Sequence, residues 1–208
     1  MQIVKKVQSV QNVLEISYYN SYVTIKTVRT HKETNMSKKV LIIVDMLNDF
    51  IDKSGALYCG DTARSIIPFI QERLEAFRNR GDLVIYLQDS HDKNDKEFQR
   101  FPSHCVSGTR GNEIIHELTP KPGENVIPKK RYSGFYGTDL ESILESAGVD
   151  EVEVVGVCTS ICVMDTVGGL ANRDYKITVP VKGVADFDQK SHEFALKRMK
   201  QLYGANVS

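Results

Sequence analysis

Short apolar runs alternate with amphipathic stretches from residue 38 onward. Runs rich in Val, Ile and Leu are typical of strands buried on both faces of a sheet; they are Val40–Asp45, Leu83–Leu87, Val152–Val157 and Ile177–Pro180. Stretches with helical signals are Ala63–Arg80, Thr138–Gly148, Cys162–Asn172 and Ser191–Leu202. Because strands alternating with helices favour right-handed βαβ units, we expect an α/β protein: a single-domain three-layer fold with a central mostly parallel sheet flanked by helices on both faces.

Signals at the helix ends support these boundaries. Gly81 follows the first helix as a good C′ residue, and Pro68 indicates that the regular helix begins a turn or less before it. Thr138–Glu141 has the pattern of a capping box that opens the second helix, which stops at Gly148.

Residues 1–37 differ from the rest of the chain. They are rich in Gln, Ser, Thr, Asn, Lys and Tyr, with only loose alternation over Tyr22–Val28. Met36 stands just before the first strong strand and would make a natural start codon. We expect residues 1–37 to be a poorly ordered or mis-called N-terminal extension, with an added edge hairpin as the other interpretation. Residues 38–208 are the predicted folded domain.

Charge limits the binding partners that we expect, and cysteine content indicates the cellular compartment. The chain has 27 basic and 27 acidic residues and a net charge of zero, so nothing predicts binding to nucleic acid or to an anionic membrane. No apolar run approaches the roughly 20 residues that span a bilayer. The four cysteines form no paired C-x-x-C motifs, and a chain of this length does not need disulfides. We expect a cytoplasmic protein with a small-molecule partner.

Three predicted strands lead into chemically capable residues. Asp45 ends the first, Asp89 follows the second, and Cys162 lies just beyond the third. Sites in open α/β sheets form beyond the carboxyl ends of the strands. A carboxyl at the rim of a dry core should have a raised pKa and could accept a proton. Asp is also a common turn former, and Asp49 is a competing carboxylate in the following loop.

Cys162 is the candidate nucleophile. It falls in the first turn of a predicted helix, where unpaired N–H groups and the macrodipole favour the thiolate over the thiol. The alternative is a buried cysteine that packs as a small hydrophobic residue. Cys158 lies four residues earlier, so a stress-induced disulfide between the two is conceivable.

The irregular stretch from Asp89 to about Thr109 is too long for a simple connection. Asp89 and His91 project to one side of an extended segment, and His104 can complete a metal site. Glu97 is a plausible fourth ligand or base. Mixed nitrogen and oxygen donors suit zinc, manganese or iron(II); the alternative is an ordinary surface loop.

A basic segment begins at Pro128 and contains two adjacent lysines, Lys129 and Lys130. A lysine that faces the cysteine and the aspartate would stabilise the thiolate and developing negative charge. Arg131 follows them, and three adjacent cations more often form a solvated turn. Charge alone does not decide which of the two lysines points inward.

Together these residues resemble the nicotinamidase branch of the isochorismatase-like cysteine hydrolase superfamily. The resemblance spans nearly all of residues 38–208, which it makes an isochorismatase-like hydrolase domain. The matching segments keep their order and spacing; they are Ile43–Phe50, Asp89–His91, Phe101–Thr109, Lys129–Asp139 and Gly156–Thr166.

The resemblance implies a metal-assisted cysteine amidohydrolase that converts nicotinamide to nicotinate and ammonia through a thioester on Cys162, in NAD salvage. Its triad is Asp45, Lys129 and Cys162, since the family lysine lies three residues before the tyrosine that corresponds to Tyr132. The N–H groups of Cys158 and Cys162 would form the oxyanion hole, beside a cis peptide bond between Val157 and Cys158.

The resemblance also implies a divalent metal ion that binds the substrate's pyridine nitrogen. Its ligands would be Asp89, His91 and His104, with Glu97 at a fourth position seen in some members. Zinc is the first choice, with iron or manganese as the others. Phe50 and Tyr132 would bind the substrate.

Two departures from the family pattern leave the substrate open. Asp165 replaces a frequent histidine, and Ser160 stands where many relatives have an acidic residue. Another small amide, a carbamoyl or ureido compound, or isochorismate is the alternative substrate. A non-enzymatic metal or ligand-binding module is a further alternative and would have an unreactive Cys162. Because relatives form dimers and tetramers, the resemblance implies a homo-oligomer.

Overall fold

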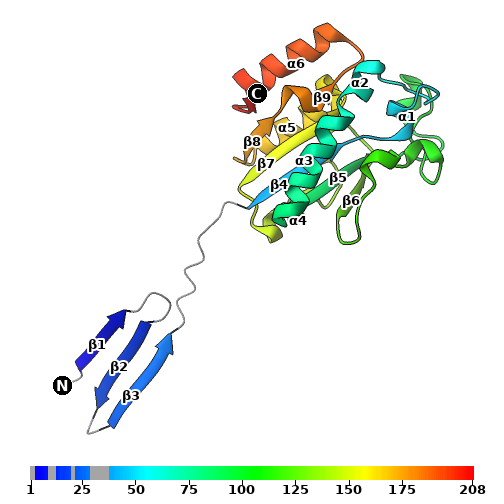
Figure 1. Ribbon diagram of the computed structural model, residues 1–208. Coiled ribbons are helices and arrows are strands. Elements are labelled where there is room, and N and C mark those ends of the chain that lie inside the picture. Colours follow the sequence, from blue (N-terminus) through cyan, green and yellow to red (C-terminus); the bar gives the residue numbers. More distant parts are fainter. Residues whose placement is uncertain (1–2, 9–12, 20–21, 29–37) are drawn as a thin grey trace. The chain divides into compact units, whose positions relative to one another are not determined.

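The computed structural model describes residues 3–8, 13–19, 22–28 and 38–208, and the chain divides into two units, Met1–Met36 and Ser37–Ser208 (Figure 1). In the first unit, strands β1 (Ile3–Gln8), β2 (Val13–Tyr19) and β3 (Tyr22–Val28) form an antiparallel sheet in that order. Met36 lies outside the described residues, so the alternative start codon stays a prediction.

The second unit is built on a seven-stranded sheet in which every strand pair is parallel. Its strands are β4 (Lys39–Val44), β5 (Leu83–Asp89), β6 (Asn125–Lys129), β7 (Glu151–Val157), β8 (Lys176–Val179), β9 (Val184–Ala185) and β10 (Asn206–Val207). The order is β10-β8-β7-β4-β5-β6, with β9 beside β7. The second unit therefore begins with β4 in the middle of its sheet. The next strands, β5 and β6, add on one side of β4, and the later strands add on its other side. The predicted α/β fold is confirmed.

The part of the chain that the structure describes has six α-helices (Figure 1). They are α1 (Asn48–Ile51), α2 (Asp61–Ser65), α3 (Ile67–Arg80), α4 (Leu140–Ala147), α5 (Met164–Ala171) and α6 (Gln189–Gln201). Helix α3 lies on one face of the sheet, and α4, α5 and α6 lie on the other. Short 3-10 turns occupy Lys96–Gln99, Arg110–Asn112, His116–Leu118 and Val181–Gly183, and a π-helical turn occupies Thr159–Val163. No helix among the described residues has the length and apolar character to cross a membrane.

Two apolar cores lie on opposite faces of the sheet. Along β4, Leu41 and Ile43 pack with α3, whereas Val40, Ile42 and Val44 pack with helices α4 to α6. Successive side chains of a strand point to opposite faces. The continuous apolar run of β4 is thus explained by helices on both sides.

One predicted helix start is confirmed, and others are wrong for identifiable reasons. The helical stretch Ala63–Arg80 is divided into α2 and α3. Because α3 starts at Ile67, the expectation that the regular helix begins a turn or less before Pro68 is confirmed. The helix expected from Cys162 starts with the π-helical turn. Thr138 does not complete a capping box, since the N-cap of α4 is Asp139 and the Glu141 carboxylate pairs with Arg173.

Three strands of the second unit were not predicted from the pattern. In β6 the apolar run is broken by Pro128, which the position of β6 at the edge of the sheet permits. Strands β9 and β10 have two residues each, which is too short for a periodic signal.

Gly156 allows β7 to lie close to β4 beside the carboxyl ends of these strands. Its φ is +119°, and a Cβ there would overlap the backbone oxygen of Val44. We expect Gly156→Ala to lower the free energy of unfolding by about 3 kcal/mol, from backbone strain and crowding together. Urea denaturation checks this.

The matched control is Gly81→Ala. Gly81 also has a positive φ, +71°, but beyond its chain neighbours no described residue has an atom within 4 Å of the Cβ position. We expect this variant to lose only about 1 kcal/mol. Equal losses in the two variants would contradict the crowding at Gly156.

Candidate active site

Four neighbouring strands deliver the candidate residues to one edge of the sheet. Asp45 follows β4, Asp89 ends β5, Lys129 ends β6, and Cys158 follows β7. The register places Asp89 directly opposite Lys129. The residues lie at the carboxyl ends of the strands, near the point between β4 and β7 where the direction of strand addition reverses. Sites in such sheets usually form there.

The side chain of Lys129 is buried among three groups. It is 1% exposed. Its Nζ lies 2.8 Å from Asp45 Oδ2, and 3.4 Å from both Asp89 Oδ1 and Cys162 Sγ. Lys130 instead lies on the surface and pairs with Asp92 at 2.6 Å. The structure therefore selects Lys129 as the inward lysine.

Burial and charge determine the protonation of this group. Burial raises the pKa of Asp45 to about 6, although the ammonium of Lys129 lowers it. Burial lowers the pKa of Lys129, but the charges of Asp45, Cys162 and Asp89 outweigh it and hold the pKa well above the ordinary value. Lys129 is therefore a permanent cation, and Asp45 is a base near neutral pH.

The electrostatics of Cys162 differ from the expectation based on the helix N-terminus. Burial raises the pKa of the Cys162 thiol well above its usual value, and Lys129 only partly offsets this. Furthermore, the carboxylate of Asp186 accepts the N–H of Ser160 at 2.7 Å, which puts a negative charge at the positive end of this helical segment. The thiol is therefore protonated at rest and needs a base.

Asp49, the competing carboxylate, has a structural position. It lies in α1, and its oxygens accept the N–H groups of Ala56 at 3.1 Å and Cys105 at 2.7 Å. Asp45 instead has a φ of +51°, uncommon for a residue other than glycine. This backbone turn brings the Asp45 carboxyl to Lys129.

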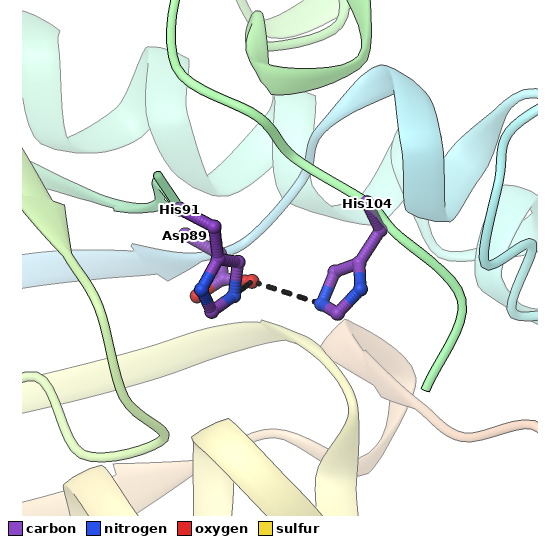
Figure 2. Close-up of side chains that lie close together, drawn as sticks. All are labelled: Asp89, His91 and His104. Atoms are coloured by element: carbon purple, nitrogen blue, oxygen red, sulfur yellow. Dashed lines mark hydrogen bonds and ion pairs between the residues drawn. The ribbon is translucent and has the colours of Figure 1, made fainter. Parts of the chain in front are cut away.

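Asp89, His91 and His104 form a group whose ligand atoms all lie within 4.8 Å of one another (Figure 2). Asp89 Oδ2 lies 2.9 Å from His91 Nε2 and 3.4 Å from His104 Nε2. Among the described residues, Glu97 is not part of this close group. It is buried, and it lines a cavity that Asp89 and His104 also line.

These residues fit a divalent metal ion. Two imidazole nitrogens and a carboxylate are a usual donor set for zinc, iron or manganese. In addition, Glu97 Oε2 is buried without a hydrogen-bond partner among the described residues, and a buried unpaired carboxylate oxygen is costly unless something binds it.

A cavity opens at this edge of the sheet. It is bordered by carboxyl, thiol and imidazole side chains, which belong to Asp45, Asp89, Glu97, His104, Cys158 and Cys162. Its apolar wall consists of Phe50, Leu57, Phe101, Tyr132, Ile161 and Phe187. The cavity therefore brings most of the predicted site residues together, including Phe50 and Tyr132, while Lys129 and His91 are fully buried side chains behind it.

The turn between β7 and α5 shapes the surroundings of Cys162. The peptide bond between Val157 and Cys158 is cis, as the resemblance implies. The N–H groups of Ile161 and Val163 both donate to the carbonyl oxygen of Cys158. The sulfur next to Cys158 Sγ is Cys59 Sγ, at 3.1 Å, and all four cysteines are free thiols.

Sequence reasoning missed Asp186, which accepts the N–H of Ser160 in the turn that carries Cys162. The signal was present, because Asp186 directly follows two apolar residues of β9 just as Asp45 follows β4. A strand of two residues gives too short a run to be recognised.

Comparisons with known proteins agree with this fold. The isochorismatase domain model matches residues 39–208. An uncharacterized isochorismatase family protein, PncA of Bacillus subtilis, is 37% identical over 82% of this chain and 99% of its own length. The crystal structure of nicotinamidase PncA from Bacillus subtilis has a TM-score of 0.78 and 38% identity, over 82% of this chain and 99% of that chain.

Two further solved structures resemble the chain. Pyrazinamidase of Pyrococcus horikoshii in complex with zinc has a TM-score of 0.77 and 31% identity, over 82% of this chain and 98% of its own. N-carbamoylsarcosine amidase from Thermoplasma acidophilum has a TM-score of 0.75 and 35% identity, over 82% of this chain and 95% of its own.

Removing the buried ammonium should destabilise the fold. Lys129→Met leaves the carboxylates of Asp45 and Asp89 without their cation, so we expect the free energy of unfolding to fall by about 3 kcal/mol. Chemical denaturation of the metal-free protein at pH 8 measures it. The control is Lys130→Met, which removes an exposed ion pair and should cost less than about 1 kcal/mol. Similar losses in the two variants would contradict the buried pairing.

Proposed function

We propose that this protein, which belongs to the isochorismatase family, is a metal-assisted cysteine hydrolase that converts nicotinamide and water to nicotinate and ammonia. Its family and its amidase neighbours make it a hydrolase acting on amides. One observation carries the finer proposal: Lys129 Nζ lies within 3.4 Å of a buried carboxylate and a buried thiol beside a His-His-Asp group.

The proposed reaction begins with a proton transfer. Asp45, whose pKa burial raises to about 6, accepts the thiol proton of Cys162. The sulfur then attacks the carboxamide carbon, and the backbone N–H groups of Cys158 and Cys162 hold the oxyanion. One such donor typically contributes about 10²–10³ in rate.

Collapse of this intermediate releases ammonia. Asp45 gives its proton to the leaving nitrogen, so the carbon–nitrogen bond breaks and a thioester remains on Cys162. Asp45 then accepts a proton from water, whose oxygen attacks the thioester carbon. The carbon–sulfur bond breaks, Asp45 returns the proton to the Cys162 sulfur, and the acid product leaves as nicotinate after losing its own proton to solvent. Lys129 stays protonated throughout, because its pKa is well above the ordinary value, and it stabilises the negative charge wherever it lies.

Asp89, His91 and His104 would hold a divalent ion, with zinc as the first choice. When bound, the ion supplies a Lewis-acid contact for a ring nitrogen of the substrate. The ring of Phe50, tilted against His104 at 5.5 Å between centroids, gives the cavity an apolar wall next to the metal donors. A flat heteroaromatic amide matches such a wall.

A carbamoyl compound is the second candidate substrate. The resemblance to N-carbamoylsarcosine amidase favours it, and Asp165 and Ser160 depart from the nicotinamidase pattern near the nucleophile. We also propose a cytoplasmic location, where thiols stay reduced, and a supply of nicotinate to pyridine nucleotide synthesis.

The decisive experiment measures ammonia released from nicotinamide and N-carbamoylsarcosine, before and after removal of metal with a chelator. We expect nicotinamide to be the better substrate, and its hydrolysis to be lost on chelation and restored by zinc. Cys162→Ala should lower the rate by about 10⁴-fold or more. Cys105→Ala is the matched control, because Cys105 is a buried thiol outside the cavity lining.

Each other result has a defined meaning. Hydrolysis of nicotinamide by Cys162→Ala at the parent rate would remove the thioester mechanism. Nicotinamide hydrolysis that is indifferent to chelation would remove the metal's role. Faster ammonia release from the carbamoyl compound would replace nicotinamide by the second candidate.

The base should produce an acid limb in the pH profile. Asp45 can accept a proton only when ionised, and burial raises its pKa to about 6. Below that pH the carboxyl is protonated, so kcat/KM should fall about tenfold for each further pH unit. Steady-state kinetics from about pH 5 to pH 8, with metal content measured at each point, separate this effect from loss of the ion. A flat profile with the metal retained would contradict the role of Asp45.

A further inference from the structure

We infer that Asp95 is a positioning residue of the metal centre, whose carboxylate holds His91 and Glu97 in the arrangement that receives the ion. The inference rests on the metal site of the proposed function. It adds a residue that touches neither the ion nor the substrate, and that acts on two donors at once.

The contacts of Asp95 carry the inference. Its side chain is 5% exposed. Oδ1 accepts the N–H of Glu97 at 2.9 Å, while Oδ2 lies 3.1 Å from a guanidinium nitrogen of Arg131. Oδ2 also lies 3.1 Å from His91 Nδ1, an ion-pair distance, although this contact is not aligned as a hydrogen bond. One buried carboxylate therefore joins the segment that carries Glu97 to the ring of His91.

For His91, the effect of Asp95 is on the tautomer. A neutral imidazole has one nitrogen with a proton and one with a free lone pair. The charge of a carboxylate beside Nδ1 favours the proton there, so that when an ion is bound the lone pair of Nε2 is free for it. Nε2 is the nitrogen that lies 2.9 Å from Asp89 Oδ2. Neutral imidazole nitrogen is the form that binds metal.

The ring of His104 is oriented in the same way as that of His91, but by a backbone carbonyl oxygen. His104 Nδ1 lies 2.7 Å from the carbonyl oxygen of Pro102, which leaves His104 Nε2 facing Asp89. Figure 2 shows the His104 ring directed at the Asp89 carboxylate from across the site. The protein thus directs the same nitrogen of both rings to one point, using Asp95 for one and a backbone carbonyl for the other.

For Glu97, the effect of Asp95 is on the backbone. Asp95 is the N-cap of the 3-10 turn Lys96–Gln99, and its bond to the Glu97 N–H sets the start of that turn. Glu97 is 4% exposed, and its Oε2 has no hydrogen-bond partner in the described part of the chain. The cap therefore presents an unpaired carboxylate at the cavity.

Arg131 pairs with Oδ2 of Asp95, the same oxygen that lies beside His91. Arg131 lies two residues beyond Lys129, so the same segment that delivers the catalytic lysine also compensates the charge of Asp95. The neighbouring pair Lys130–Asp92 joins the same two segments, but both of its side chains are largely exposed. This pair is a natural control for any general effect of removing an ion pair between the segments.

The test compares Asp95→Asn with Asp92→Asn in the full chain. Asparagine keeps the shape of aspartate. Whichever way its amide faces, it loses either the acceptor beside His91 Nδ1 or the acceptor for the Glu97 N–H. We expect Asp95→Asn to bind zinc about 10–100-fold more weakly, as is typical when an outer partner of a metal ligand is removed. Asp92→Asn should match the parent.

Zinc affinity is measured on metal-free protein by competition with a chromophoric chelator. The visible absorption of bound cobalt(II) reports the ligand geometry, which a purely structural role of Asp95 would leave unchanged; we expect an altered spectrum for Asp95→Asn only. Thermal unfolding of the metal-free forms checks that the variants are folded. If Asp95→Asn does not fold, Arg131→Met, which removes the partner of Asp95 without touching either donor, should weaken zinc binding several-fold.

The outcomes separate this inference from the function it rests on. Parent-like zinc affinity and an unchanged cobalt spectrum in folded Asp95→Asn, or in Arg131→Met where the former does not fold, would overturn the role of Asp95 while the metal site stands. A parent protein that hydrolyses nicotinamide but binds neither zinc nor cobalt would overturn the inference together with the metal's role, and would leave the cysteine mechanism intact.

Discussion

The buried ammonium of Lys129 is the interaction on which the site depends. A charge that is almost completely buried is tolerated only when it is paired, and Lys129 is paired with Asp45 and Asp89 from two other strands. These partners come together only if β4, β5 and β6 are parallel and in the observed register. The sheet therefore organises the site, and the paired charges in turn favour that register.

Asp89 joins the two side-chain groups of the candidate site because its two oxygens face different partners. Oδ1 lies near Lys129, and Oδ2 lies near the imidazoles of His91 and His104. Burial works to raise the pKa of Asp89, but Lys129 and the two histidines outweigh it and hold the pKa well below its usual range. The carboxylate therefore stays charged and can serve the ammonium and a metal ion at the same time.

The sequence predicts this molecule well where one pattern determines the outcome. Apolar runs located β4, β5 and β7, and residues at their carboxyl ends proved to be neighbours. The choice between Lys129 and Lys130 could be made only from the register of β6. The sequence pattern did not predict β6, because Pro128 interrupts its apolar run. The thiol of Cys162 was misjudged because its pKa reflects burial and the charges around it more than its place in a helix.

In the proposed reaction, a neutral resting thiol suits this arrangement better than a permanent thiolate would. Before proton transfer the negative charge is on Asp45, 2.8 Å from Lys129 Nζ; afterwards it is on Cys162 Sγ, 3.4 Å from the same atom. The net charge of the buried group does not change, and the cation keeps a close partner in both states. Because uncompensated burial is what makes charge costly in a protein interior, moving the proton within this group avoids most of that cost. In the proposed steps the proton that leaves the thiol is held on Asp45 and is then given to the departing ammonia.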